Sequence, residues 1–211
     1  PLRAFPYDEG DGEFRVEFSV EDGVLDYAPG WPRLENVSTT VVIDHDSLSS
    51  LENTGTIAGI PFRDAQVRVA DLMHKPELQL ATADDLQVGQ VLAFLRASPI
   101  ARTLGPTLNN VTGRGDVATA VQLTMPIARP ADFRVTGSFE TSGASLGLRG
   151  VAHRLTDLNG LIRLDNTRLF AEKLGGQFLD EPVAITLRPA GKDEPDLSHV
   201  AGLSGATPVG K

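Results

Sequence analysis

The sequence contains no cysteine, and this absence removes several functional classes together. Disulfide frameworks, thiolate metal sites and cysteine nucleophiles all need the missing sulfur. There is also no apolar run near the ~18 residues of a membrane-spanning helix, and the first residues do not resemble a signal peptide. Aromatic residues make up only 6% of the 211 residues, so the apolar content of the chain is mostly aliphatic.

Positive charge is scarce as well. Nineteen Lys and Arg stand against 28 Asp and Glu, which gives a net charge of −9. This balance argues against nucleic acid as a partner, because phosphate binding needs clustered basic residues and none appear in the sequence. The same balance argues against docking on anionic lipid head groups. A hydrophobic content of 41% argues against disorder, while 21 Gly and 14 Pro predict many turns.

The dominant pattern is alternation of apolar and polar residues, beginning with Phe14, Val16, Phe18 and Val20. Later segments repeat it: Val37, Val41 and Ile43; Ala65, Val67 and Val69; Leu78 and Leu80; Val117, Val121 and Leu123; Phe133, Val135 and Phe139; Ile162 and Leu164; and Val183, Ile185 and Leu187. Successive side chains of a strand point to opposite faces, so each segment predicts a strand with one apolar face. Turn residues separate the segments, which favours a mainly β, antiparallel meander.

One segment follows helical spacing instead. Apolar residues between Asp84 and Ala97 recur at intervals of three and four, which predicts one amphipathic helix over 84–97. Thr82 or Asp84 can cap its start, and Pro99 ends it near Ser98.

The sequence also repeats at an offset of 121 residues. Residues around 34–70 match residues around 155–188, as in the match of Leu34 to Leu155. We therefore expect a flexible amino-terminal segment (1–13), a β-rich module (14–189) with two repeat-like units, and a linker or disordered tail (190–211).

Short motifs give little support for catalysis. Gly143 to Gly147 fits the nucleophile-elbow pattern around Ser145, but no helix follows it, and a Gly/Ser hairpin turn is the better interpretation. Asp44-His45-Asp46 is interpreted as a turn, because adjacent strand residues point apart and rarely bind one metal. Arg114-Gly115-Asp116 is an adhesion tripeptide that recurs easily by chance. We expect no enzyme activity, no cofactor and no metal.

At least eight apolar strand faces and one helix leave more apolar surface than water tolerates. The sheet must either fold on itself as a closed core or hold an apolar ligand. Since aliphatic residues dominate this face, the ligand of the second option would itself be aliphatic, such as an acyl chain. The residues alone leave both options open.

Several phrases resemble the YhdP branch of the AsmA-like proteins. Residues 23–27 followed by Trp31-Pro32-Arg33-Leu34 resemble the start of a unit in that branch. Residues 94–100 resemble its helix end, residues 121–127 a strand closed by proline, and residues 155–162 the start of a further unit. The resemblance covers roughly residues 14–188.

This resemblance implies a strongly curved antiparallel β-sheet of the repeating β-groove type. It also implies the periplasmic portion of an inner-membrane-anchored envelope protein of Gram-negative bacteria, related to TamB. Such proteins are thought to carry phospholipid acyl chains between the inner and outer membranes, and the family supplies no catalytic residue. The chain starts without Met, lacks an anchor and is shorter than a full bridge. We therefore expect a segment of a longer parent, whose other parts contact the membrane.

The groove candidates are inward-facing apolar residues: Ile57, Val67, Val69, Leu78, Leu80, Val121, Leu123, Val135 and Phe139. We expect Trp31 to plug one end or to pack between units, and the helix to cap the sheet. Phospholipid acyl chains are the expected ligand, and other envelope proteins are further candidate partners. The alternative function is a structural or adhesive β-sandwich module that binds protein or glycan.

Overall fold

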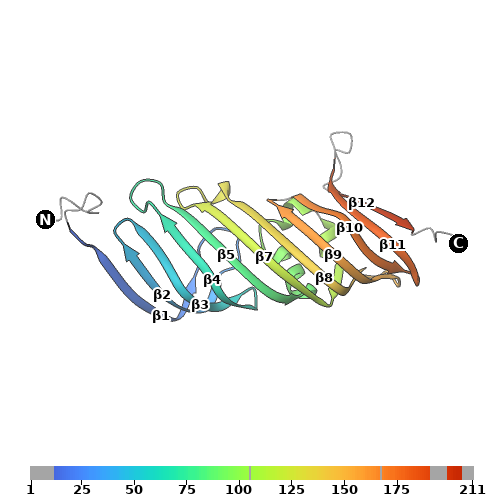
Figure 1. Ribbon diagram of the computed structural model, residues 1–211, viewed down its shortest axis with the longest axis horizontal. Coiled ribbons are helices and arrows are strands. Elements are labelled where there is room, and N and C mark those ends of the chain that lie inside the picture. Colours follow the sequence, from blue (N-terminus) through green and yellow to red (C-terminus); the bar gives the residue numbers. More distant parts are fainter. Residues whose placement is uncertain (1–11, 105, 167, 191–198, 206–211) are drawn as a thin grey trace. The chain divides into compact units, whose positions relative to one another are not determined.

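The protein is mainly β, as predicted, and its strands form one open antiparallel sheet (Figure 1). The computed structural model describes residues 12–104, 106–166, 168–190 and 199–205. In this part of the chain the sheet has 12 strands, in the order β1-β2-β3-β4-β5-β7-β8-β9-β10-β11-β12, with β6 paired to β8. In the described residues β1 and β12 end this order without pairing to each other, so the sheet is open.

Most strands are 11 residues long. They are β1 (Arg15–Leu25), β2 (Leu34–Asp44), β3 (Ser47–Ile57), β4 (Ile60–Ala70), β5 (Glu77–Gln87), β6 (Val111–Arg114), β7 (Asp116–Pro126), β8 (Arg134–Leu148), β9 (Arg154–Asp165), β10 (Arg168–Phe178), β11 (Glu181–Pro189) and β12 (His199–Gly205). The helical elements are α1 (Val88–Ala97), α2 (Ala101–Leu104), η2 (Pro106–Asn109) and η3 (Pro130–Asp132).

The chain divides into two compact units, which are described separately. Unit 1 comprises Pro1–Ala83 and Val121–Val135, and unit 2 comprises Asp84–Ala120 and Thr136–Lys211. Unit 1 buries Val69, Met125 and Val135 among other residues. Unit 2 has a core cluster of Ala144, Leu158, Ala171, Leu174, Val183 and Ile185.

The helix begins later than the sequence predicted. Residues 84–87 belong to β5, and the backbone carbonyl of Asp84 accepts a hydrogen bond from Thr119 Oγ1 at 2.8 Å. α1 starts only at Val88, after Gln87, whose backbone N–H donates to Gln90 Oε1 at 2.8 Å in a capping box. Neither Thr82 nor Asp84 is the cap. The predicted end is confirmed, since α1 stops at Ala97 and Ser98 takes an extended conformation before Pro99.

The predicted linker at 190–211 is wrong for residues 199–205, which form β12 on the edge of β11. Main-chain pairing with β11 stabilises this strand without side-chain alternation. Gly202 suits its position because a Cβ there would lie 2.7 Å from Thr186 Oγ1. The other predicted tail residues, apart from Ala190, lie outside the described part of the chain, as do residues 1–11 of the predicted amino-terminal segment.

The offset of 121 residues also relates strand registers. All eight β1–β2 pairs, from Arg15↔Asp44 to Leu25↔Leu34, recur in β8–β9 with 121 added to both numbers, as in Thr136↔Asp165. The β2–β3 turn likewise recurs in β9–β10, and His45 and its equivalent Asn166 both have positive φ, at 51° and 53°. The repeat therefore includes β1 and β8 as well as the strands recognised from sequence.

The repeat includes the irregularities of the sheet. Register shifts interrupt β1–β2 between Val20 and Leu25, and β8–β9 at the equivalent positions. Further shifts fall near the middle of β2–β3 and β3–β4. A β-bulge bends the strand that carries it and increases its twist, so a row of bulges bends the sheet within each unit.

One of these bulges corrects the prediction of a hairpin turn at 143–147. β8 runs unbroken from Arg134 to Leu148, and Gly143, with φ +77°, lies at a register shift inside it. Glycine supplies the positive φ that a bulge needs, which explains why the sequence there resembles a turn.

Candidate functional site

The candidate site is the apolar face of the sheet in unit 1. Residues directly opposite each other in an antiparallel pair share a face, so the register traces rows across the strands. One row comprises Val16, Ile43, Leu48, Val69 and Leu78, and the next comprises Phe18, Val41, Ser50, Val67 and Leu80. Nine of these ten side chains are apolar, and the two rows cross five strands without a charged residue.

The opposite face of the same strands is mostly polar, although Val42 of β2 lies on it and is only 6% exposed. The intervening row comprises Glu17, Val42, Ser49, Arg68 and Gln79. The alternation read from the sequence therefore gives each strand one apolar and one polar face. Four predicted groove residues, namely Val67, Val69, Leu78 and Leu80, share one face in two neighbouring register pairs.

A polar cavity on unit 1 extends this assignment of faces to β7 and β8. The cavity, of about 350 Å³, is lined by Glu77, Thr124, Pro126, Asp132 and Arg134. These residues include the direct sequence neighbours of Leu78, Leu123 and Val135, so by strand alternation those three lie on the opposite, apolar face. The cavity itself has charged walls and does not suit an acyl chain.

An aromatic cluster joins two distant connections of unit 1. The Trp31 ring lies edge-on to Phe133 with centroids 5.1 Å apart, and the Tyr27 ring lies 6.2 Å from Trp31. Tyr27 and Trp31 belong to the β1–β2 connection (residues 26–33), in which Ala28 is buried. Burial raises the pKa of the Tyr27 hydroxyl above its usual range. Phe133 precedes Val135 by two residues and so shares its apolar face.

The Trp31–Phe133 contact requires the sheet of unit 1 to curl. The starts of β2 and β8 lie five strand positions apart in the sheet order and at opposite strand ends. In a flat sheet they would be roughly 35–40 Å apart. Trp31 lies three residues before Leu34, so the intervening chain and the two rings span roughly 20–25 Å. The β1–β2 connection therefore lies across a concave apolar face.

Burial on this face changes from one side to the other. Val69, Leu123 and Val135 are buried, whereas Phe18 of β1 is 46% exposed and Val16 39%. The side near β7 and β8 is thus covered, and the side near β1 is open.

In unit 2, α1 packs on the apolar face of the sheet. Val88 packs against the core cluster, as do Leu146, Leu155 and Phe178. A Cβ on Gly113 of β6 would lie 2.3 Å from Val88 Cγ1 and 3.3 Å from Leu92 Cδ1, so α1 lies directly over this strand. The guanidinium of Arg96 donates to the carbonyl oxygens of Leu108, at 3.2 Å, and Val111.

The remaining predicted groove residues occupy mixed environments. Ile57 and Val121 are half-buried, and Phe139 is half-buried and in register with Ile162, which packs on the unit 2 cluster. Sequence reasoning did not include Val16, Phe18, Ile43 or Leu48 as candidates. The signal that could have found them is the hairpin register, because short turns between strands fix which residues face each other.

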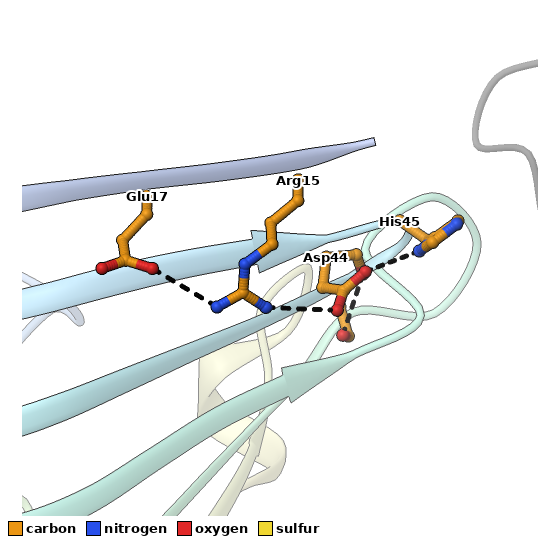
Figure 2. A network of polar contacts seen from close by, with 5 residues as sticks. Arg15, Glu17, Asp44 and His45 are labelled. Atoms are coloured by element: carbon orange, nitrogen blue, oxygen red, sulfur yellow. Dashed lines mark hydrogen bonds and ion pairs between the residues drawn. The ribbon is translucent and has the colours of Figure 1, made fainter. Parts of the chain in front are cut away.

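Figure 2 shows the polar network at the start of β1 and the end of β2. Arg15 contacts Glu17 Oε2 at 3.3 Å and Asp44 Oδ2 at 3.5 Å, and His45 Nδ1 lies 2.6 Å from Asp44 Oδ1. The network is a cross-strand pairing at a turn. Among the described residues, no group of three or more His, Asp or Glu side chains is arranged to hold a metal ion.

Ser145 and the Arg114-Gly115-Asp116 tripeptide both lie in the paired strands of the sheet and at their junctions. Ser145 lies inside β8 in register with Arg114, not at the strand-to-helix turn that an elbow requires. Gly115, with φ +104°, packs its backbone against Ala144, and Gln87 Nε2 donates to Asp116 Oδ1. None of the helices in the described ranges is both long and apolar enough to cross a bilayer.

Comparison with known proteins gives one family. A family model described as YhdP protein matches residues 1–203. No match was found among curated proteins or among solved structures.

Proposed function

The chain belongs to the YhdP family, and from this premise we propose that the apolar face of unit 1 holds phospholipid acyl chains. Membership of this family indicates an envelope protein with a role related to lipid transport. The proposal is more specific: the sheet binds acyl chains without hydrolysing them and supports phospholipid movement between the inner and outer membranes. The periplasm is the proposed location of this part of the protein.

The observation that carries the proposal is the pair of uncharged rows across β1–β5, with Phe18 and Val16 still exposed at one side. Burying an acyl chain releases about 0.8 kcal/mol for each methylene, so a long chain binds such a surface without any polar anchor. The curl of unit 1 adds contact on more than one side of the chain. A dry closed core would instead leave no apolar row open.

Several features support binding over catalysis. Ser145 lacks the geometry of a nucleophile, and the apolar rows contain only Ser50 as a hydroxyl. Among the described residues, Trp31 and Tyr27, two aromatic side chains that a glycan- or protein-binding module could display, pack on each other, and Trp31 also packs on Phe133. The adhesive alternative therefore gains no support from these residues.

The test introduces a photo-crosslinking amino acid into the protein while it is in the cell, at one position at a time. Placed at Val67 or Leu80, which face each other on the apolar side, it should capture phospholipid. Placed at Arg68 or Gln79, the adjacent register pair on the polar side, it should not.

These two pairs form a matched control, because they lie on the same two strands at nearly the same position. Lipid adducts confined to the Val67–Leu80 pair support the proposal. Adducts with protein only, or equal lipid labelling on both faces, would reject it.

A further inference from the structure

The two repeats differ in what covers their first strand. β1 and β8 occupy equivalent positions, since each pairs with the next strand through the same eight register pairs. In unit 2 the far edge of β8 carries β6, which pairs Arg114 with Ser145 and Gly113 with Leu146, the counterparts of Val24 and Leu25 of β1. The other two β6 pairs, to Gly147 and Leu148, correspond to residues 26 and 27 of the β1–β2 connection. In the described residues β1 pairs only with β2. Within the described residues, this strand position is therefore covered in one repeat and has no covering strand in the other.

The cover on β8 is a helix followed by a strand. The side chains of Val88, Leu92 and Leu146 surround the position that a Cβ on Gly113 would take. Leu146 Cδ2 would lie 3.0 Å from that Cβ. Arg96 joins the helix to β6 through its hydrogen bond to the carbonyl of Val111. We call residues 88–114 the α1–β6 element, because α1 and β6 pack together and act on β8 as one piece.

The residues of β1 that correspond to the covered end of β8 are exposed. Leu25 corresponds to Leu146 and is 51% exposed, and the neighbouring Val24 is 65% exposed. Gly23 corresponds to Ala144, which is only 1% exposed in the unit 2 core. Leu25 therefore has the large aliphatic side chain that α1 and β6 cover at Leu146, but in β1 this side chain is exposed.

We propose that the free edge and apolar end of β1 dock a helix–strand element of the α1–β6 kind. The strand of the partner pairs antiparallel with β1 beside Val24 and Leu25, and the partner helix lays its apolar stripe on Leu25. The occupant is a polypeptide, so this surface is distinct from the proposed lipid site. The basis is continuity with an interface that the chain already makes once, on β8.

The contact of α1 and β6 with β8 also indicates which residues the partner must carry. Its helix carries apolar residues with the spacing of Val88, Leu92 and Leu95, which lie on one face. Its strand carries glycine where Gly113 stands, because a side chain there would overlap Val88. An element with a branched residue at that position would not seat its helix.

The probe is a synthetic peptide of residues 84–115 added to the full chain. It should bind, and Leu25→Asp in the full chain should weaken binding at least about tenfold, because a carboxylate would be buried under the helix. Leu179→Asp is the matched control: Leu179 is 57% exposed and lies at the β10–β11 turn, so binding should stay unchanged. A peptide with Gly113→Val should bind at least about tenfold more weakly.

A photo-crosslinking residue at Leu25 gives a second measurement that does not depend on the stability of the Asp variant. Peptide adducts at Leu25 support the proposal. The proposal is overturned if the peptide does not bind, if Leu25→Asp binds it like the unchanged chain, or if the adducts are phospholipid. The lipid proposal is judged separately at Val67 and Leu80, so the two can fail independently.

Discussion

The ring of Tyr27 lies beside Trp31, which is the single tryptophan of the chain. Burial of Tyr27 disfavours its phenolate, so its pKa in the folded protein lies above the value of about 10 expected in an unfolded chain. The neutral hydroxyl therefore contributes stability that is fully present below pH ~10 and is lost as the pH rises above it. The aromatic cluster is thus expected to be alkali-sensitive.

We expect the cluster to loosen above pH ~10, and the fluorescence of Trp31 to shift to longer wavelength as water reaches the indole. Tyr27→Phe retains the ring and removes the ionising group, so this variant should keep the blue-shifted emission to higher pH. The difference between the two pH curves is the measurement. Superimposable curves would show that the Tyr27 hydroxyl does not control the cluster.

Single residues also show what the sequence could reveal. Parity along a strand assigned Val67 and Val69 to the apolar face, because an unbroken strand alternates without exception. Parity could not reveal that Val69 is buried while Phe18 is exposed. That difference depends on residues 26–33 lying across the sheet, and a contact between Trp31 and Phe133 leaves no local trace in the sequence.

At the scale of elements, the repeat places different chemistry in equivalent strands. Asn53 of β3 corresponds, with 121 added, to Leu174 of β10, and both side chains are buried. Asn53 connects three strands: its Nδ2 donates to the carbonyl of Ala65 at 2.5 Å, and its Oδ1 accepts from Thr39 Oγ1 at 2.6 Å. Leu174 instead packs in the apolar cluster of unit 2.

We expect exchange of these residues to destabilise in both directions. Asn53→Leu should cost about 1–3 kcal/mol, because the hydroxyl of Thr39 and the carbonyl of Ala65 lose a buried partner. Leu174→Asn should cost about 2–5 kcal/mol, because it buries an amide among aliphatic side chains and removes packing volume. Denaturant unfolding of the two variants measures both changes. A neutral result for Asn53→Leu would mean that the repeats tolerate either residue at this position.

Some helix and strand boundaries could not be predicted from the sequence pattern. Leu86 fits the helical spacing of α1 and equally fits the alternation of β5, and only pairing with β7 decides for the strand. β12 was missed because edge pairing with β11 stabilises a segment of low alternation. The bulges were missed because a residue such as Asp157, with φ +48°, resembles an ordinary polar position.

At the scale of the whole molecule, an open sheet has two edges, and the amide groups on each edge lack a neighbouring strand. In the described residues β1 pairs with β2 alone and β12 with β11 alone. β8 holds the position of β1 in the other repeat, yet it is flanked on both sides, by β9 and by β7 with β6. Comparing β1 with β8 therefore isolates the effect of an edge at constant register.

Amide hydrogen exchange should separate the two strands. Alternate amides of β1 point away from β2 and have no strand partner among the described residues, so β1 should exchange faster than β8, and β12 faster than β10. Equal protection of β1 and β8 would mean that the edge is covered in solution. Adding the peptide of residues 84–115 should slow exchange in β1, since a docked strand supplies the missing acceptors, and should leave β3 and β10 unchanged. Slowing spread over all strands would instead indicate a general gain in stability rather than docking at this edge.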